Sequence, residues 1–293
     1  MRRLGLTRPD LLGLLGVAVF AGTYPATRLA VGGGVDPLMN ASVRILGAGV
    51  LAFVVLLVTR TPRPAWGMLP RFALAGAGVG IVFPLCLGFA LQIVPASHGA
   101  VVMAALPLAT TTYACLRGHA WPSGKFWLAG AAAALLVLAF SWRHATGTTE
   151  AGVGAADALL VLAMLGAAVG YVEGAKLTTP ERPGWQVISW ALVALLPFMG
   201  PVACWRLTTL TTEVTPVAWT ALAYGTVFSM YLGFFPWYRA MQQAGVARIS
   251  QWQYLQPFLA IAYAVVLLGE RVDAVDLALV LAVVGAIAWG RRK

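Results

Sequence analysis

Residues 250–257 form the densest group of polar side chains inside an apolar stretch, reading Ser-Gln-Trp-Gln-Tyr-Leu-Gln-Pro. Helical spacing places Trp252, Gln253 and Gln256 on one side of a helix. The two amides offer hydrogen-bond donors and acceptors, and Trp252 offers a flat apolar wall. Such a face can bind the polar head of a small zwitterion and stack against its apolar part. Glutamines also bond neighbouring helices together, but three glutamines and two aromatics in one helix favour a binding site.

Two charged residues also lie within apolar stretches. Arg44 lies about seven residues into the stretch 37–59, about 10 Å from its outer end. It could bind a substrate carboxylate, but the sequence favours a side chain that reaches outward or bonds helix-end carbonyls. Glu173 precedes Lys176 by three residues near the end of the stretch 153–177. An ion pair within one helix is the favoured interpretation of Glu173, and a proton-coupling carboxylate is the alternative.

Aromatic residues and prolines complete the set of candidate site residues. Tyr24 and Tyr231 are candidate substrate contacts, although aromatics at helical spacing more often pack against neighbouring helices. Pro107 and Pro257 lie in the middle of apolar stretches, where a proline kinks a helix and frees a carbonyl. The two prolines could form a paired gate whose freed carbonyls line a cavity, or they could only bend the two helices, and the sequence favours neither interpretation. Other prolines, among them Pro84 and Pro236, show no clear counterpart in the other half of the chain.

The elements that carry these residues are set by composition. Of the 293 residues, 60% are hydrophobic and 10% are charged, against about 45–50% and 25% in soluble domains. So few charges exclude a soluble enzyme or a DNA-binding protein. A helix crosses a bilayer with about 20 apolar residues, which predicts an all-α integral membrane protein with ten transmembrane helices. We place the spans at about 11–31, 37–59, 70–93, 96–116, 122–141, 153–177, 184–205, 216–238, 247–268 and 273–290.

The basic residues indicate how the spans are oriented. The net charge is +10, and the 20 Lys and Arg residues gather between the apolar stretches. With the N-terminus inside, fifteen lie in cytoplasmic segments, four lie outside, and Arg44 lies within a span. This bias predicts cytoplasmic N- and C-termini in an inner membrane. The bilayer and a small molecule are therefore the expected partners, rather than nucleic acid, and the sequence leaves the oligomeric state open.

The two halves of the chain resemble each other. Under a shift of 150 residues, several matches keep their order: Ala90-Leu91-Gln92 with Ala240-Met241-Gln242, Pro107 with Pro257, and Tyr113-Ala114 with Tyr263-Ala264. Each half holds five predicted spans, so the second half enters the membrane from the opposite side. The sequence thus predicts two five-helix inverted repeats, residues 1–146 and 147–293. Many secondary transporters use inverted repeats to expose a midplane site alternately to each side.

Motifs for catalysis and metal binding are missing from the sequence. There is no HExxH zinc motif, no GxSxG nucleophile motif in a suitable setting and no acidic pair at mid-depth. The three histidines, His98, His119 and His144, have no carboxylate at ligand spacing, and Asp157 at a span end needs no role. We therefore expect no metal, no cofactor and no enzyme activity.

The ninth predicted span carries a recognisable pattern. Residues 245–257 read GVARISQWQYLQP, and residues 267–271 read LLGER. This pattern resembles the EamA-domain family of the drug/metabolite transporter superfamily, and Arg44 resembles a recurrent family position. The resemblance covers the whole chain and implies a central cavity lined by spans one, three, four, six, eight and nine. The first half reads Gly118-His119-Ala120 where the motif has Gly269-Glu270, so we expect Glu270 to cap a helix or anchor a loop.

Together these features predict a secondary transporter that exports hydrophobic or aromatic amino acids, or related metabolites, by alternating access. A proton-coupled exporter of drugs or other amphipathic metabolites is the main alternative. The lack of a mid-depth carboxylate favours facilitated diffusion or exchange over a proton relay. A lipid or nucleotide-sugar carrier would favour several basic residues at mid-depth, where only Arg44 lies. A membrane-embedded enzyme acting on lipid-linked substrates is the least favoured alternative.

Overall fold

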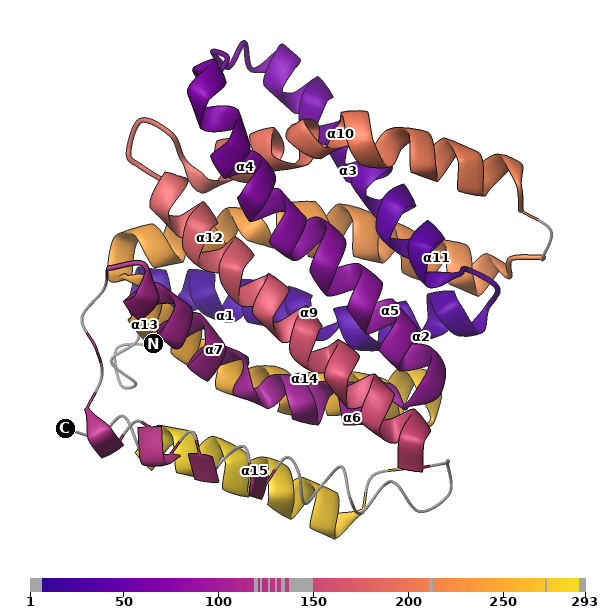
Figure 1. Cartoon of the computed structure of the whole chain (residues 1–293), viewed down its shortest axis with the longest axis vertical. Helices are drawn as coiled ribbons and strands as arrows, with labels where there is room; N and C mark the ends of the chain where they lie inside the picture. The colour runs from indigo at the N-terminus through magenta and orange to yellow at the C-terminus, as the bar shows by residue number, and fades with distance from the viewer. Residues whose placement is uncertain are drawn as a thin grey trace.

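The computed structural model describes residues 7–118, 150–210, 213–271 and 273–289, and also 121, 123–125, 127–129, 131–132 and 135–136. All regular structure in this part of the chain is helical. The packed helices enclose one extensive hydrophobic core and a smaller cluster between α2, α3 and α11 (Figure 1). The predicted all-α architecture is therefore confirmed for the described residues.

Seven described helical stretches are long and apolar enough to cross a membrane: Arg8–Gly32, Pro37–Val58, Trp66–Ile93, Ala96–Leu116, Gly154–Leu177, Gly184–Thr208 and Pro216–Ala244. Each corresponds to a span predicted from the sequence. The predicted ninth span is also helical, but its glutamine-rich start places it outside these seven. The predicted fifth span, 122–141, lies largely outside the described residues.

The first half contains four of these stretches, and several are built from more than one helical segment (η marks a 3-10 or π segment). The segments are α1 (Arg8–Ala21), α2 (Thr23–Gly32), α3 (Pro37–Val58), η2 (Trp66–Met68), α4 (Leu69–Gly76), η3 (Ala77–Val82), α5 (Phe83–Ile93), α6 (Ala96–Val102), η4 (Met103–Ala105) and α7 (Leu106–Leu116). Asp36 caps α3 by accepting hydrogen bonds from the backbone N–H groups of Leu38 and Met39.

The second half begins with two long helices and continues with interrupted ones. The segments are α9 (Glu150–Leu177), α10 (Gly184–Thr208), α11 (Pro216–Tyr224), η5 (Gly225–Leu232), α12 (Phe234–Ala244), α13 (Val246–Ile249), η6 (Ser250–Leu255), α14 (Gln256–Leu268) and α15 (Ala274–Trp289). Figure 1 shows α9 crossing the bundle obliquely in front of α1.

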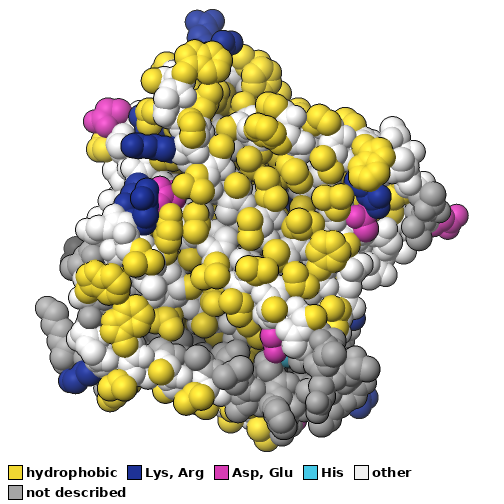
Figure 2. Space-filling model, in the orientation of Figure 1, with side chains coloured by type: hydrophobic (Ala, Val, Ile, Leu, Met, Phe, Trp, Pro, Cys, Tyr) yellow, Lys and Arg dark blue, Asp and Glu magenta, His cyan; other side chains and the backbone are white. Residues whose placement is uncertain are grey.

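The surface of the bundle is apolar over most of its visible face. Figure 2 shows hydrophobic side chains across the middle of this face, with charged side chains gathered toward its edges. Large apolar side chains such as Leu57, Phe198 and Val266 are more than half exposed. A soluble protein rarely exposes a contiguous patch of this kind, whereas lipid tails solvate it well. The surface therefore fits a multi-pass membrane protein.

Regular α-helical structure is interrupted just before Pro107 and Pro257, the two prolines at which the sequence predicts kinks. Each proline is the second residue of an α-helix, α7 or α14, and each follows a short 3-10 segment, η4 or η6. Proline has no N–H and its ring collides with the carbonyl of the preceding turn, so regular α-helical bonding stops there. The two interruptions occur at positions related by the 150-residue shift.

A second pair of interruptions was not expected from the sequence. The π segments η3 and η5 overlap under the same 150-residue shift, and each is followed closely by a proline, Pro84 or Pro236. The expectation that these two prolines lack counterparts was therefore wrong, because their spacing is 152 residues rather than 150. Single-turn π segments frequently accompany functional sites.

Candidate functional site

A narrow cavity lies inside the bundle, close to the π segments and the break between α1 and α2. Its empty volume is about 320 Å³, divided into gaps between side chains that are barely wide enough for water. The residues around it are Phe20, Thr23, Arg44, Val79, Phe83, Ala167, Tyr171, Ser229, Met230, Phe234 and Gln256. The family resemblance implied a lining by the fourth span and none by the second. Among the described residues the reverse holds: α3, the second span, contributes Arg44, and the fourth span contributes no residue.

Of the described residues that line this cavity, Arg44 alone is charged, and it is 1% exposed. Its Nη2 donates to the hydroxyl of Ser229 over 3.2 Å, and that hydroxyl lies 2.6 Å from the hydroxyl of Thr23. The favoured prediction that Arg44 reaches outward or bonds helix-end carbonyls was wrong. The physical reason is the absence of a side chain at Gly225, where an added Cβ would lie only 3.0 Å from Arg44 Nε. The guanidinium occupies that space instead.

Several buried polar atoms at this depth have no hydrogen-bond partner among the described residues. They are Arg44 Nε, Gln256 Oε1, and both Oε1 and Nε2 of Gln253. Gln256 does use its Nε2, which donates to the hydroxyl of Tyr24 over 3.2 Å. Leaving a buried donor or acceptor unpaired costs about 1–3 kcal/mol, more for a charged group. A polar ligand next to Arg44 and Gln256 would relieve this cost.

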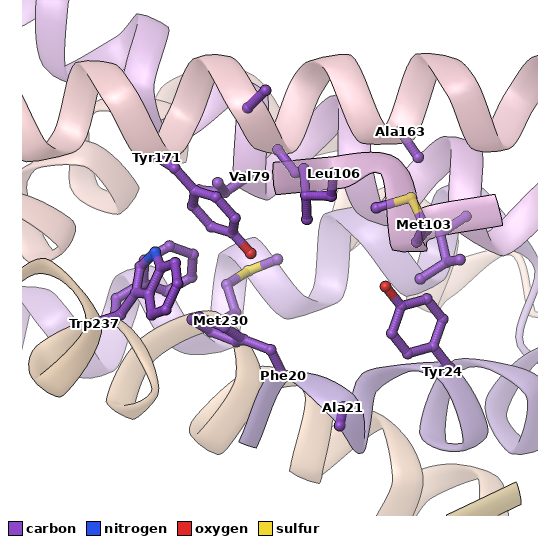
Figure 3. Close-up of a cluster of buried hydrophobic side chains, with 14 of the residues drawn as sticks. Phe20, Ala21, Tyr24, Val79, Met103, Leu106, Ala163, Tyr171, Met230 and Trp237 are labelled. Atoms are coloured by element: carbon purple, nitrogen blue, oxygen red, sulfur yellow. The ribbon is translucent and has the colours of Figure 1, made fainter. Parts of the chain in front are cut away.

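Aromatic side chains form the apolar wall on the other side of the cavity. Figure 3 shows Phe20, Tyr171, Met230 and Trp237 gathered between neighbouring helices, with the Tyr171 hydroxyl turned toward Met230. The ring centroids of Phe20 and Phe234 are 5.0 Å apart, and those of Tyr171 and Trp237 are 5.4 Å apart. These rings belong to α1, α9 and α12, which therefore meet at the cavity.

Of the six predicted substrate contacts, Arg44 and Gln256 line the described cavity, whereas four do not: Tyr24, Tyr231, Trp252 and Gln253. Trp252 donates from Nε1 to Asp10 Oδ1 over 3.1 Å, near the start of α1. The prediction that Trp252 shares a face with Gln256 fails because η6 has 3-10 geometry, which turns about 120° per residue instead of 100°. Tyr231 packs toward α10, where its hydroxyl lies 2.8 Å from that of Ser189.

Glu173 has a different partner from the one expected. Its carboxylate accepts a hydrogen bond from Arg117 Nε over 2.6 Å and another from the Tyr113 hydroxyl over 2.8 Å. Lys176 instead donates to the backbone carbonyl of Arg117 over 2.6 Å. Sequence spacing shows only partners within one helix, whereas the packing of α7 against α9 supplies Arg117. The hydrogen bond to the Glu173 carboxylate raises the pKa of Arg117, which lies just beyond the end of α7.

Glu270 caps a helix, as the sequence predicted. Its two carboxylate oxygens accept hydrogen bonds from the backbone N–H groups of Ala96 and Ser97, at 2.9 and 3.0 Å. These groups begin α6, so the cap joins the second half of the chain to the first. Negative charge at a helix N-terminus is favourable because it faces unpaired N–H groups and the positive end of the helix dipole.

Two contacts between acidic and basic side chains at the ends of the bundle were not predicted. Asp10 accepts hydrogen bonds from Arg248 Nη2 at 2.7 Å and from Trp252. His98 Nε2 lies 2.7 Å from Asp157 Oδ1, a contact between spans that sequence spacing did not indicate for either residue. The internal shift could have found both pairs, because Arg248 follows His98 by 150 residues and Asp157 follows Asp10 by 147.

Comparison with known proteins places the chain in a family. The model of the EamA-like transporter family matches it twice, over residues 7–142 and 154–289. A Bacillus subtilis (strain 168) protein described as "Uncharacterized transporter YdeK" is 41% identical over 289 residues, which cover 96% of each chain. A solved structure described as "Crystal structure of protein" aligns with 97% of this chain and 98% of that one, with a TM-score of 0.68 and 16% identity. Two family matches on a bundle of apolar helices lead to one conclusion: the chain belongs to the EamA-like transporter family.

Proposed function

We propose that this chain exports small amphipathic metabolites, first among them amino acids with hydrophobic or aromatic side chains. The observation that carries the proposal is Arg44, a buried cation with an unpaired Nε–H at the edge of an aromatic cavity. A buried charge without a counter-ion is costly, and a substrate carboxylate would supply that counter-ion. Membership of a transporter family supports movement of such a ligand across the bilayer rather than its chemical conversion.

The other cavity residues fit the rest of an amino acid. The unpaired Oε1 of Gln256 can accept a hydrogen bond from a substrate ammonium group. The rings of Phe20, Tyr171 and Phe234 can pack against an apolar or aromatic side chain. Because the space is narrow in this conformation, binding requires side chains or helices to move apart. Gln253, one turn before Gln256, is a second amide that such a movement can bring to the ligand.

The architecture that we propose for this activity is two inverted five-helix halves, residues 1–146 and 147–293, with ten transmembrane helices in an inner membrane. The paired interruptions before Pro107 and Pro257, and at η3 and η5, support this repeat. The double match of the family model is also consistent with it. Inverted halves permit alternating access to a central site, with Pro107 and Pro257 as hinges. The positive charge bias of the loops supports a cytoplasmic location for both termini.

The main alternative is a proton-coupled exporter of drugs, which differs from this proposal in the source of energy for transport. Glu173 is a buried carboxylate that could carry the proton, and it lies in the span that also lines the cavity through Ala167 and Tyr171. Its bonds to Arg117 and Tyr113 balance its charge without a proton, so we favour exchange or facilitated diffusion. A membrane-embedded enzyme is less favoured because the chain belongs to a transporter family.

Counterflow in liposomes tests the proposal. Purified protein is reconstituted into vesicles loaded with an unlabelled amino-acid panel, and the accumulation of traces of labelled amino acid from outside is measured. Arg44→Gln removes the cation, and we expect a loss of about tenfold to 100-fold in the exchange rate, as for a lost hydrogen bond between charged groups. Ser42→Ala is the matched control, because Ser42 lies in the same helix and bonds only within it.

Two results would contradict the proposal. Normal exchange by Arg44→Gln and by Gln256→Leu, with both variants folded, would remove the cavity assignment. No counterflow with any amino acid, from protein that elutes as a single folded species, would remove amino acids as the substrate.

A further inference from the structure

Two carboxylates outside the cavity are each held by a basic side chain from another span. The Asp10 side chain is 5% exposed and accepts from Arg248, Trp252 and the Thr7 hydroxyl, at 2.7, 3.1 and 2.5 Å. At the second place, the His98 side chain is 2% exposed and lies 2.7 Å from Asp157. Each pair links spans that are far apart in the sequence.

The two pairs correspond under the internal shift of the chain. The first pair takes its carboxylate from the first span and its base from the ninth, where Arg248 begins the predicted binding helix. The second takes its carboxylate from the sixth span and its base from the fourth. A shift of about 150 residues converts the first span into the sixth and the fourth into the ninth. Corresponding spans of the two halves therefore carry the same type of side chain: a carboxylate on the first and sixth spans, and a basic group on the fourth and ninth.

The pairs lie on opposite sides of the cavity. Asp10 precedes the cavity residue Thr23 by 13 positions, about 20 Å along a helix at 1.5 Å per residue. Asp157 precedes the cavity residue Ala167 by ten positions, about 15 Å. In Figure 1, α13, which carries Arg248, and α6, which carries His98, lie at opposite ends of α14. One pair thus stands at each end of the route through the cavity.

We propose that Asp10–Arg248 and His98–Asp157 are the two gates of the transport cycle, which rests on the alternating access proposed above. In this structure both pairs are formed and the cavity between them is narrow, as in an occluded state. Each pair has one buried member, the Asp10 carboxylate or the His98 imidazole, and leaving a buried polar group without its partner is unfavourable unless water enters. Each pair therefore breaks only when its own end of the bundle opens to water, while the other pair stays closed.

Site-directed labelling tests the gates without any substrate. Thr23→Cys places a thiol on the cavity in a background in which Cys86, Cys115 and Cys204 are replaced by serine and which keeps normal thermal unfolding. A membrane-impermeant maleimide is applied from one side of oriented vesicles and then from the other. Asp10→Asn weakens one gate and Asp157→Asn the other, so the two variants are expected to shift the ratio of labelling in opposite directions.

We expect each shift to be at least about fivefold, which corresponds to about 1 kcal/mol of bias between the two open states. Asp36→Asn is the control: Asp36 pairs with Arg206 at 2.5 Å but links α3 to α10 outside the proposed gates, so its labelling ratio should stay unchanged. If Asp10 and Asp157 only stabilise the fold, the Asn variants should unfold at lower temperature, but the ratio of labelling from the two sides should not change. Equal shifts, or none, in both Asn variants would overturn the proposal.

A cross-linking experiment keeps the inference testable should an Asn variant fail to fold. His98→Cys with Asp157→Cys, and Asp10→Cys with Arg248→Cys, place thiols at the two gates. Oxidation of either pair should stop labelling of Thr23→Cys from its own side only, and reductant should restore it. Labelling that persists from that side after complete cross-linking contradicts the gates. Because labelling needs no substrate, failure of the gates and failure of the proposed amino-acid transport are separate results.

Discussion

At the scale of single residues, the unusual feature of the molecule is the state of its buried charges. Arg44 faces the cavity and donates to the Ser229 hydroxyl, whereas Asp10 and Glu173 each meet an arginine from a different span. A buried ion pair contributes little net stability. Removing one partner is nevertheless destabilising, because the remaining charge is then buried without compensation. Paired carboxylates therefore suit joints between helices, and the unpaired cation suits a ligand.

A prediction at this scale concerns Glu173→Gln. The amide keeps the hydrogen bond with the Tyr113 hydroxyl but cannot balance the charge of Arg117, so we expect a small fall in the unfolding temperature and an unchanged exchange rate. Thermal unfolding in detergent and counterflow measure the two quantities. Exchange that responds strongly to an imposed pH gradient, with the response lost in Glu173→Gln, would instead support the proton-coupled alternative.

At the scale of elements, close approach between helices depends on glycine. A Cβ added at Gly78 in η3 would lie 2.4 Å from the backbone carbonyl oxygen of Gly166 in α9, and one at Gly166 would meet Val82 at 2.7 Å. Backbone cannot yield as a flexible side chain does, so these helices touch only because both positions lack a side chain. Gly170, one turn after Gly166, allows the same approach, because a Cβ there would lie 2.8 Å from the backbone carbonyl oxygen of Ala75.

The prediction at this scale compares two glycines. Gly78→Ala forces η3 away from α9, and we expect a cost of about 1–3 kcal/mol, typical of overpacking. Gly154→Ala is the matched control, because nothing lies within 4 Å of a Cβ at this position in α9. Alanine favours a helix over glycine by about 0.5–1 kcal/mol, so the control should be neutral or stabilising. Equal unfolding temperatures for the two variants would show that η3 and α9 tolerate separation.

At the scale of the whole molecule, the distribution of basic residues predicts how the bundle is oriented in the bilayer. Positive charge keeps loops on the cytoplasmic side, and Figure 2 shows charges gathered at the edges of an apolar face. Asp36 and Arg206 pair at 2.5 Å, which joins the start of α3 to the end of α10 at the predicted outer side. Loops on either side of α10 should therefore face different compartments.

A topology experiment tests this orientation. Glu181 and Glu213 are both exposed and lie before and after α10. In cells, an impermeant maleimide should label Glu213→Cys without lysis, and Glu181→Cys only after the membrane is opened. Cys86, Cys115 and Cys204 are replaced by serine in both variants, so that the new thiol alone is labelled. The reverse pattern would invert the proposed topology.

The class of protein follows from the amino-acid sequence, because hydropathy, charge bias and proline positions act locally along the chain. The sequence predicted the apolar spans, the family, the kinks at Pro107 and Pro257, and the cap at Glu270. Each of these depends on residues close in sequence or on a motif. The internal shift was visible as well, although it was not used to pair His98 with Asp157.

Which side chains meet across spans depends on how the helices pack in three dimensions. The 3-10 turn of η6 directs Trp252 toward Asp10 and Gln256 toward Tyr24. Regular α-helical periodicity would instead place both side chains on one face. Glu173 meets Arg117 because α7 packs against α9, and Arg44 faces the cavity because Gly225 leaves room for it. Contacts between residues separated by 50 to 240 positions depend on packing geometry, so local pattern alone does not specify them.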